Sequence, residues 1–235
     1  MQPWFIWKGK NSYSDYGLWI NKLPPIVRAS ERYQEITVPG RAGTLLMTEG
    51  DDVYDSYLKE CVVLLPNTHN LQPILAWLRG SGDVVFSNEA DFAYEARIAG
   101  EVSFERVDNN LMQATIPFFV NPYKKKSSGD EATTLTGASG TIFNPGNVAS
   151  KPKITITNSG SSGNNTITIG NKQMLFMAVT GTIVIDCEAN IVTQSNGTLW
   201  TGAFVGDFLT IPTGSNAIAQ TGTMAVTIEP RWRWV

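Results

Sequence analysis

The segment PPIVRASERYQEITVPGRAGTLL, from Pro24 to Leu46, decides how the first half of the chain is organised. Its two opening prolines predict an extended or turning backbone ahead of Ile26, because proline fixes its own φ angle and restricts the residue before it. The charged segment Arg28–Arg32 follows. Apolar and polar residues then alternate from Gln34 to Val38, which predicts a half-buried strand.

This strand is expected to end in a tight turn. The run from Pro39 to Gly43 combines a proline, which presets φ, with two glycines that permit left-handed backbone, and it leaves Arg41 exposed. Thr44–Thr48 can then return antiparallel to the first strand. The acidic loop Glu49–Asp55 follows, and its carboxylates lack the spacing of a calcium loop, so a solvated loop is the preferred interpretation.

Length and composition restrict the class of protein. The chain has 235 residues, of which 42% are hydrophobic and 17% charged, as is typical of one large or two ordinary globular domains. A formal net charge of -3 argues against a general nucleic-acid binder. No apolar run approaches the ~20 residues of a membrane helix. The opening MQPWFIWKGK lacks the features of a secretory signal.

Residues that usually carry catalysis are sparse. His69 is the one histidine, and the two cysteines, Cys61 and Cys187, are expected to be buried and reduced. The chain therefore has too few histidines and cysteines for a zinc site, and almost no base for a Ser-His pair. The common phosphate-binding and hydrolase motifs do not occur in the sequence. Asp186 and Glu188 are expected to share the exposed face of one strand. We predict that the chain is not an enzyme and needs neither a cofactor nor a metal.

The rest of the first half predicts an antiparallel sheet with one helix laid against it. Asn70 is a plausible N-cap, Gly80 is the expected end, and four leucine and isoleucine residues between them fall on one apolar face. Trp77 lies off that stripe and is assigned to a gap between domains or subunits. The aromatic residues before Leu23 fit either core packing or a subunit interface. The strands expected in this half, besides those above, are Trp4–Trp7, Gly17–Asn21, Glu60–Leu65, Val84–Phe86, Phe92–Ala99, Glu101–Glu105 and, after a turn at Asp108–Asn110, Met112–Phe118.

A change in composition predicts a second domain. Proline, lysines and turn residues from Asn121 to Asp130 suggest a boundary, so residues 1–123 are assigned to the first domain, 124–130 to a linker and 131–235 to the second. Short strands then recur at the spacing of a β-sandwich. The fold class is mainly β: an N-terminal antiparallel β domain with one α-helix, and a C-terminal β-sandwich of the galectin-like or jelly-roll kind. The strands expected in the second half are Thr141–Phe143, Lys153–Thr157, Thr166–Ile169, Gln173–Val179, Thr182–Cys187, Asn190–Thr193, Phe208–Ile211, Asn216–Gln220 and Thr223–Glu229, with a hairpin tip at Asn158–Asn165.

Several short motifs occur in an order that resembles the phage distal tail protein (Dit) family, a component of the tips of long non-contractile siphovirus tails. The first is Pro-x-Ile-x-x-Ala-x-Glu-Arg, from Pro24 to Arg32, and Val-Pro-Gly-Arg-x-Gly ends at Gly43. None of the motifs is a catalytic signature. The others are Trp7, Gly9, Ser12 and Tyr16-Gly17-Leu18 upstream, and Phe143–Gly146, Ser150–Ile154, Val184–Cys187, Gly206–Asn216 and Pro230–Trp234 in the second half.

The resemblance implies a structural protein of a phage or prophage virion, located at the tail tip or baseplate and assembled in the host cytoplasm. It implies a hexameric ring of N-terminal domains around a channel through which DNA passes. The tail tube protein would dock on one side and the tail-tip hub on the other, and the sandwich domains would carry receptor-binding proteins. The expected contact residues are Arg28, Arg32, Pro39, Gly40, Arg41, Asp51 and Asp52, although the proline and glycines could merely shape a turn.

A carbohydrate-binding protein is the alternative hypothesis. Lectin sites usually present an exposed aromatic platform beside polar groups. Trp200, with Asn196 and Asp207 near it in sequence, is the one candidate set in the second half, although a buried tryptophan is the simpler interpretation. The large sugar-binding insertion of longer members of the resembled family does not occur in this chain.

Overall fold

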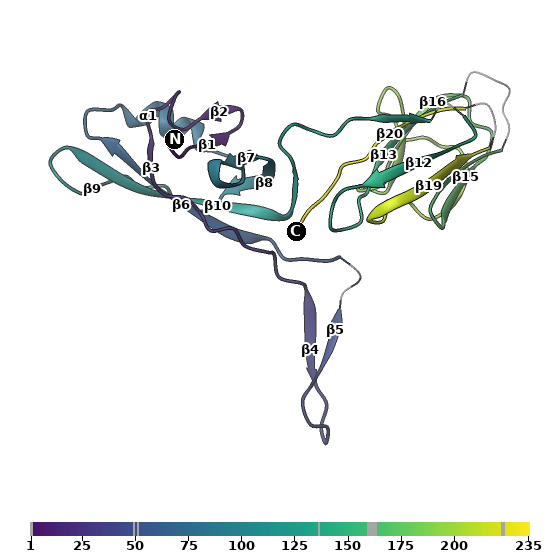
Figure 1. Cartoon of the computed structure of the whole chain (residues 1–235), viewed down its shortest axis with the longest axis horizontal. Helices are drawn as coiled ribbons and strands as arrows, with labels where there is room; N and C mark the ends of the chain where they lie inside the picture. The colour runs from purple at the N-terminus through teal and green to yellow at the C-terminus, as the bar shows by residue number, and fades with distance from the viewer. Residues whose placement is uncertain (1, 49, 51, 136, 159–163, 222–223) are drawn as a thin grey trace. The chain divides into compact units, whose positions relative to one another are not determined.

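The protein divides into two compact units, Met1–Ser128 together with Val235, and Gly129–Trp234. This computed structural model describes residues 2–48, 50, 52–135, 137–158, 164–221 and 224–235. Both units are built from antiparallel sheets, so the predicted mainly β class is confirmed (Figure 1). Lys124–Lys126, which we assigned to the linker, are instead the last residues of a long strand of the first unit.

An eight-stranded antiparallel sheet organises the first unit, in the order β2-β1-β7-β8-β10-β6-β3 with β9 beside β10. A separate hairpin and two short helices complete it. The strands of the sheet are β1 (Phe5–Trp7), β2 (Lys10–Asn11), β3 (Trp19–Lys22), β6 (Tyr57–Pro66), β7 (Ser81–Phe86), β8 (Phe92–Ile98), β9 (Glu105–Arg106) and β10 (Leu111–Lys126); the hairpin is β4 (Tyr33–Thr37) and β5 (Thr44–Thr48), and the helices are α1 (Leu71–Trp77) and the 3-10 turn η1 (Ser87–Glu89).

The predicted helix α1 forms where its cap residue places it. The Asn70 side chain accepts a hydrogen bond from the backbone N–H of Gln72 at 3.0 Å, which confirms the N-cap. The helix ends at Trp77, before the predicted stop at Gly80. Leu78 leaves helical geometry, with ψ 55°, and the Trp77 carbonyl accepts from Arg79 N at 2.9 Å and from the Trp7 indole at 3.1 Å.

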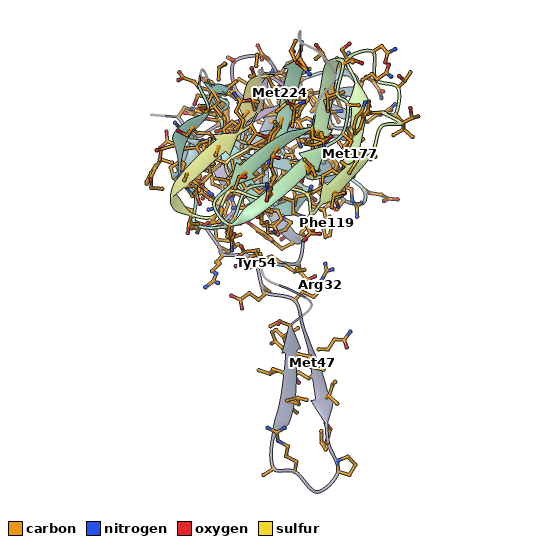
Figure 2. The ribbon with its side chains drawn as sticks, turned by 90° about the vertical axis from the view of Figure 1, so that its right-hand side faces the viewer. Arg32, Met47, Tyr54, Phe119, Met177 and Met224 are labelled. Carbon is orange, nitrogen blue, oxygen red and sulfur yellow. The ribbon has the colours of Figure 1, made fainter. Side chains whose placement is uncertain are left out.

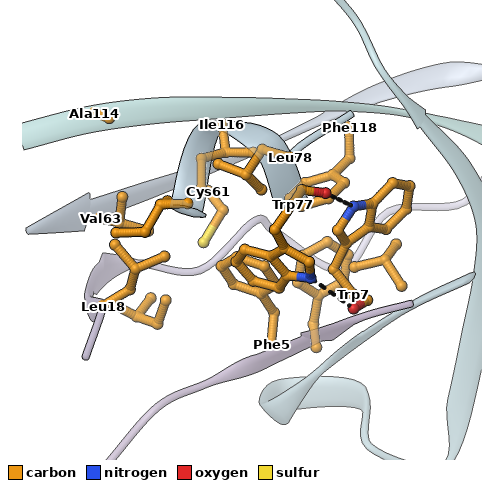
Figure 3. Close-up of a cluster of buried hydrophobic side chains, with 14 of the residues drawn as sticks. Phe5, Trp7, Leu18, Cys61, Val63, Trp77, Leu78, Ala114, Ile116 and Phe118 are labelled. Carbon is orange, nitrogen blue, oxygen red and sulfur yellow. Dashed lines mark hydrogen bonds between the residues drawn. The ribbon is translucent and has the colours of Figure 1, made fainter. Parts of the chain in front are cut away.

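Trp77 lies in the core of the first unit, so its assignment to a gap between domains or subunits was wrong. Its indole N–H donates to the Trp7 carbonyl at 3.0 Å while the Trp7 indole donates back, and the two chain segments are tied reciprocally (Figure 3). The Trp77 ring stacks on Phe5 and on Tyr16, with centroids 5.6 and 4.2 Å away. Phe5 and Trp7 are fully buried, so these two aromatic residues belong to the core and not to a subunit interface. Trp19, by contrast, is 43% exposed.

Two prolines disturb the long strand β10. Pro117 has no N–H to donate, and β8 pairs with β10 only from Phe118 onward. The predicted strand Glu101–Glu105 is therefore wrong, except that Glu105 begins β9, which rejoins β10 at Gln113. The second irregularity lies between Val120 and Lys124, at Pro122. The predicted turn at Asp108–Asn110 is confirmed, with the Asp108 carboxylate accepting from Asn110 N at 2.6 Å.

The second unit is a β-sandwich, as predicted. Its two five-stranded sheets run in the orders β11-β20-β13-β16-β17 and β12-β19-β14-β15-β18, and buried side chains from both sheets form one core cluster. The strands are β11 (Thr133–Leu135), β12 (Ser139–Asn144), β13 (Lys153–Asn158), β14 (Asn165–Ile169), β15 (Lys172–Phe176), β16 (Gly181–Asp186), β17 (Ile191–Gln194), β18 (Phe204–Gly206), β19 (Gly214–Gln220) and β20 (Met224–Glu229).

The strand predicted at Phe208–Ile211 is wrong. Leu209 and Ile211 are fully buried, but the segment pairs only through an isolated bridge from Ile211 to Ser150. The alternation of apolar residues correctly indicated buried side chains, but a buried segment need not pair with a neighbouring strand. The strands β11 and β18 were not predicted. The predicted hairpin at Asn158–Asn165 is wrong, because β13 and β14 on either side of it belong to different sheets. Residues 159–163, and the first residue of the predicted strand at 223–229, lie outside the described residues.

Candidate interaction surface

The hairpin β4–β5 is the part of the first unit that its own sheet leaves uncovered. Within the part of the chain that the structure describes, these strands pair only with each other, from Tyr33 opposite Thr48 to Thr37 opposite Thr44. The predicted antiparallel return is confirmed. We call residues 33–48 the arm. Figure 1 shows it extending away from the sheet of the first unit, and Figure 2 shows its side chains, with Met47 labelled.

The arm is exposed on both faces, so the prediction of a half-buried strand was wrong. All five residues of β4 are exposed. The register places Ile36, Leu45 and Met47 on one face with Gln34, and Leu46 on the other with Glu35. Ile36 is 38% exposed and Met47 is 51% exposed. The alternation correctly identified an apolar face, but no element described in this chain covers it.

The tip of the arm has the geometry that its sequence predicts. Arg41 N donates to the Val38 carbonyl at 3.2 Å, which closes a four-residue turn. Pro39 occupies the second position of the turn, and Gly40 has φ +81° at the third, as a type II turn requires. Gly43 also has φ +81°. Arg41 is exposed at this end.

The root of the arm is held by a short ladder and by ion pairs. Arg32 N donates to the Val53 carbonyl, and Asp55 N to the Ser30 carbonyl, each at 2.9 Å. The Arg32 guanidinium lies 2.7 Å from the Asp55 carboxylate. Arg28 pairs with Glu31 beside it, at 2.5 Å.

A tyrosine ties the root to the sheet. The Tyr123 hydroxyl, from β10, donates to the Asp52 carbonyl, and its ring meets Tyr54 edge-on. The predicted contact residues therefore fall into two groups. Arg28, Arg32 and Asp52 lie at the root, whereas Pro39, Gly40 and Arg41 form the tip. Asp51 lies outside the described residues.

A buried charged network anchors the chain just before the arm, and sequence reasoning missed it. The Lys59 ammonium donates to the Pro25 carbonyl at 2.9 Å and to Glu89 at 3.2 Å. Lys124 and the Tyr94 hydroxyl also donate to Glu89, at 3.0 and 2.6 Å. We call Lys59, Glu89, Lys124 and Tyr94 the anchor cluster.

The two prolines ahead of the arm are held in place through their carbonyls. Asn88 donates to the Pro24 carbonyl at 3.0 Å, so both proline carbonyls are bonded to the sheet side of the unit. Lys59 shares the inward positions of β6 with Cys61 and Val63, and the alternation alone could have indicated a buried lysine. Its two hydrogen-bond partners are the Pro25 carbonyl and Glu89 of η1, and no local pattern connects either of them to β6.

Burial shapes the titration of this network. Burial lowers the pKa of Lys59, although the Glu89 carboxylate opposes this change. For Glu89, burial acts to raise the pKa, but hydrogen bonds from Tyr94 and Lys124 and the charges of both lysines outweigh it, and the pKa is lowered. Burial likewise raises the pKa of Tyr57, on β6, to about 12. We therefore treat the network as two cations sharing one anion.

The paired carboxylates of the second unit form an ion cluster with the C-terminal segment. Asp186 ends β16, and Glu188 lies in the turn after it, so they do not share one strand as we expected. Arg231 binds Asp186 at 2.8 and 2.9 Å, and Arg233 lies 2.6 Å from Glu188. The hydrogen bonds from Arg231 lower the pKa of Asp186 to about 2.

The candidate lectin residues do not form a free platform. Trp200 is half-buried and packs on the core of the sandwich, with its ring centroid 6.0 Å from that of Phe176. The Asn196 side chain accepts from Thr198 N at 3.0 Å and shapes its own turn. Asp207 is exposed. This geometry gives no support to the carbohydrate-binding hypothesis.

The remaining chemistry of the described residues is limited. Cys61 and Cys187 are free and buried, as predicted, and burial raises the pKa of their thiols to about 12 and about 11. Among the residues described, no three His, Cys, Asp or Glu side chains gather in a way that could hold a metal ion. None of the described helices is long and apolar enough to span a membrane.

Comparison with known proteins bears on the fold. No protein-family model matches the chain, and no match is found among curated protein sequences. Among solved structures, the chain is similar to the SPP1 Dit (gp 19.1) protein, described as a paradigm of the hub adsorption apparatus in Gram-positive-infecting phages. The TM-score is 0.80 at 14% sequence identity, and 100% of each chain is covered. At this identity the likeness shows the fold, and at that level the resemblance predicted from the motifs is confirmed.

Proposed function

We propose that the protein is a structural subunit of a phage or prophage tail tip, where copies of it assemble into a ring that joins the tail tube to the tip hub. One observation carries the proposal. A chain whose fold matches a phage hub protein along its whole length also extends an apolar arm that nothing described in the chain covers. A two-stranded hairpin alone is at best marginally stable in water, so such an arm is expected to have a partner.

The proposed mechanism is geometric. The first unit supplies the ring, six copies enclose a channel that lets DNA pass, and the arm fastens neighbouring copies. The tail tube protein docks on one side of the ring and the hub on the other. The sandwich unit offers its outer surfaces to receptor-binding proteins. The role requires no catalytic group or cofactor, and we propose none.

Purified full-length protein tests this function in two conditions. Its mass is measured across a concentration series, alone and mixed with a tail tube protein from the same phage or prophage, and the largest species is imaged by negative stain. Rings with a central hole, alone or stacked on the tube, are the expected result. A chain that remains monomeric in both conditions would contradict the proposal. Binding of a cell-wall polysaccharide that is lost in a Trp200→Ala variant would instead favour a lectin.

A further inference from the structure

The sheet of the first unit has a second apolar face, which α1 and the buried core do not use. Trp19 lies opposite Leu64, and Leu58 lies opposite Phe119, in the registers of β3, β6 and β10. Their inward neighbours on β6 and β10 are buried, so these side chains share the outer side of the sheet. Trp19 is 43% and Leu58 is 48% exposed, while Val62, between Leu58 and Leu64 on β6, is half-buried. We call these residues the open face.

Two charged side chains lie among these apolar residues: exposed Lys22, opposite Val62 in the register of β3 and β6, and Glu60. Glu60 lies on β6 between Leu58 and Val62 and is exposed. Within the described residues it has no ion-pair partner. With Glu101, Glu105 and Arg106 it lines a recess of about 360 Å³ beside β10, so three carboxylates and one cation meet there. An apolar face around an unpaired carboxylate fits an apolar partner that carries a cation.

The arm has this combination. Ile36, Leu45 and Met47 form its apolar face, and from Ile36 to Thr48 its one charged residue is Arg41. Arg41, like Glu60, has no ion-pair partner among the residues that the structure describes. The recess far exceeds the ~30 Å³ that one water molecule occupies in the liquid, so it has room for a guanidinium group.

The dimensions also agree. At a rise of about 3.3 Å per residue, five-residue strands give the arm a length of roughly 17 Å, and the row from Leu58 to Leu64 spans about 20 Å. We propose that the open face receives the arm of a second copy of this chain, with the apolar face of the arm on Trp19, Val62 and Leu64 and with Arg41 at Glu60. This inference rests on the proposed function and names the surface on which the arm closes the ring.

Two neighbouring arm residues provide a matched test. Met47 and Leu46 are similarly exposed, at 51% and 60%, but point to opposite faces of the arm. Self-association of the full chain is measured by mass, alone and with the tail tube protein, after circular dichroism has confirmed folding. Met47→Glu should weaken association about tenfold or more, as the loss of an interface anchor does. Leu46→Glu should leave the strength of self-association within a few-fold of that of the unmodified chain.

A charge swap tests the pairing itself. Arg41→Glu and Glu60→Arg should each weaken association, and the double variant should recover it, because the two charges then attract again. If the double variant is as weak as the two losses combined, Arg41 does not meet Glu60. If Met47→Glu and Leu46→Glu assemble alike into normal rings, the docking inference is overturned while the proposed ring survives. If the unmodified chain never assembles, the proposed function fails first.

Crosslinking shows whether the contact joins two copies. A chain with Arg41→Cys mixed with a chain with Glu60→Cys should form a disulfide dimer, since native Cys61 and Cys187 are buried and do not compete. The control mixture uses Arg41→Cys with Leu199→Cys, because Leu199 is 67% exposed in the second unit. Equal crosslinking in the two mixtures would contradict docking on the open face.

Discussion

Replacing Glu89 by glutamine should loosen the anchor cluster and destabilise the first unit. The Glu89 side chain is only 6% exposed and contacts both the Lys59 and the Lys124 ammonium groups, whose side chains are 1% and 11% exposed. Glutamine keeps a hydrogen-bond acceptor of nearly the same shape but removes the negative charge. Two buried cations would then face each other without a counter-charge.

The magnitude follows from the burial of the three groups. Removing one partner of a buried ion pair costs about 3–5 kcal/mol, and the retained acceptor places Glu89→Gln near the lower end, at about 3 kcal/mol. Lys59→Met should cost less, about 1–2 kcal/mol, because Glu89 loses one donor but keeps Lys124 and Tyr94, while the Pro25 carbonyl loses the Lys59 donor. The structure therefore predicts that the carboxylate matters more than the more deeply buried lysine.

Hydrogen exchange read peptide by peptide on the full chain measures both effects. Peptides of β6 and β10 report the free energy of opening the first unit, while peptides of the second unit serve as an internal control. The segment before the arm, Pro24–Arg32, should exchange faster in both variants. The assignment of one shared anion would be refuted if Glu89→Gln lowered the free energy of opening by less than about 1 kcal/mol. It would also be refuted if Lys59→Met lowered it by more than Glu89→Gln does.

Acid provides a second test of the same cluster. Because the folded-state pKa of Glu89 is lowered from the ordinary 4.5, its contribution to stability is fully present above that pH. The contribution is lost as the pH falls through the folded-state pKa of Glu89. The first unit of the unmodified chain should weaken in that range, and the Glu89→Gln variant should lack this part of the pH dependence.

Three further predictions concern single contacts. Trp77→Phe removes the indole that donates to the Trp7 carbonyl and should destabilise the first unit by about 2 kcal/mol in the same exchange measurement. The Asp186 pKa of about 2, against an ordinary 3.8, implies stability of the second unit that is present above about pH 4 and lost toward pH 2. Because solvent screens this partly exposed pair with Arg231, the contribution is limited to about 1 kcal/mol. Asp186→Asn should remove this pH dependence of the stability of the second unit, as measured by urea titrations at several pH values. Gly40→Ala forces a side chain into φ +81° and should cost about 1–2 kcal/mol locally, seen as faster exchange in the arm.

The elements that sequence reasoning predicted well are those set by local rules. The bounds of β5, the Asn70 cap and the turn at Asp108 each depend on side chains within a few residues of the backbone they shape. The sandwich was predictable because its strands alternate with period two and are separated by turn residues. Local rules also account for the Pro39-Gly40 turn, where the proline and the glycine each take the one position that suits its φ angle.

The elements that it missed depend on contacts between distant segments. The anchor cluster joins β6, η1 and β10, and no spacing along the chain relates Lys59 to Glu89 or Lys124. Arg231 reaches Asp186 across 45 positions of sequence. The false strand at Phe208–Ile211 arose because a buried loop and a buried strand both alternate apolar residues, and only pairing distinguishes them.

The wrong prediction for β4 is more informative than these omissions. An alternating strand normally buries its apolar side because a sheet or helix of the same domain covers it. Ile36 and Met47 follow this pattern, yet they stay exposed in the chain alone. A sequence patterned for burial, on a hairpin too small to be stable by itself, supports our proposal that another molecule covers the arm. The open face around Glu60 presents the converse arrangement, a paired sheet with apolar side chains facing outward, so a second copy offers each surface what it lacks.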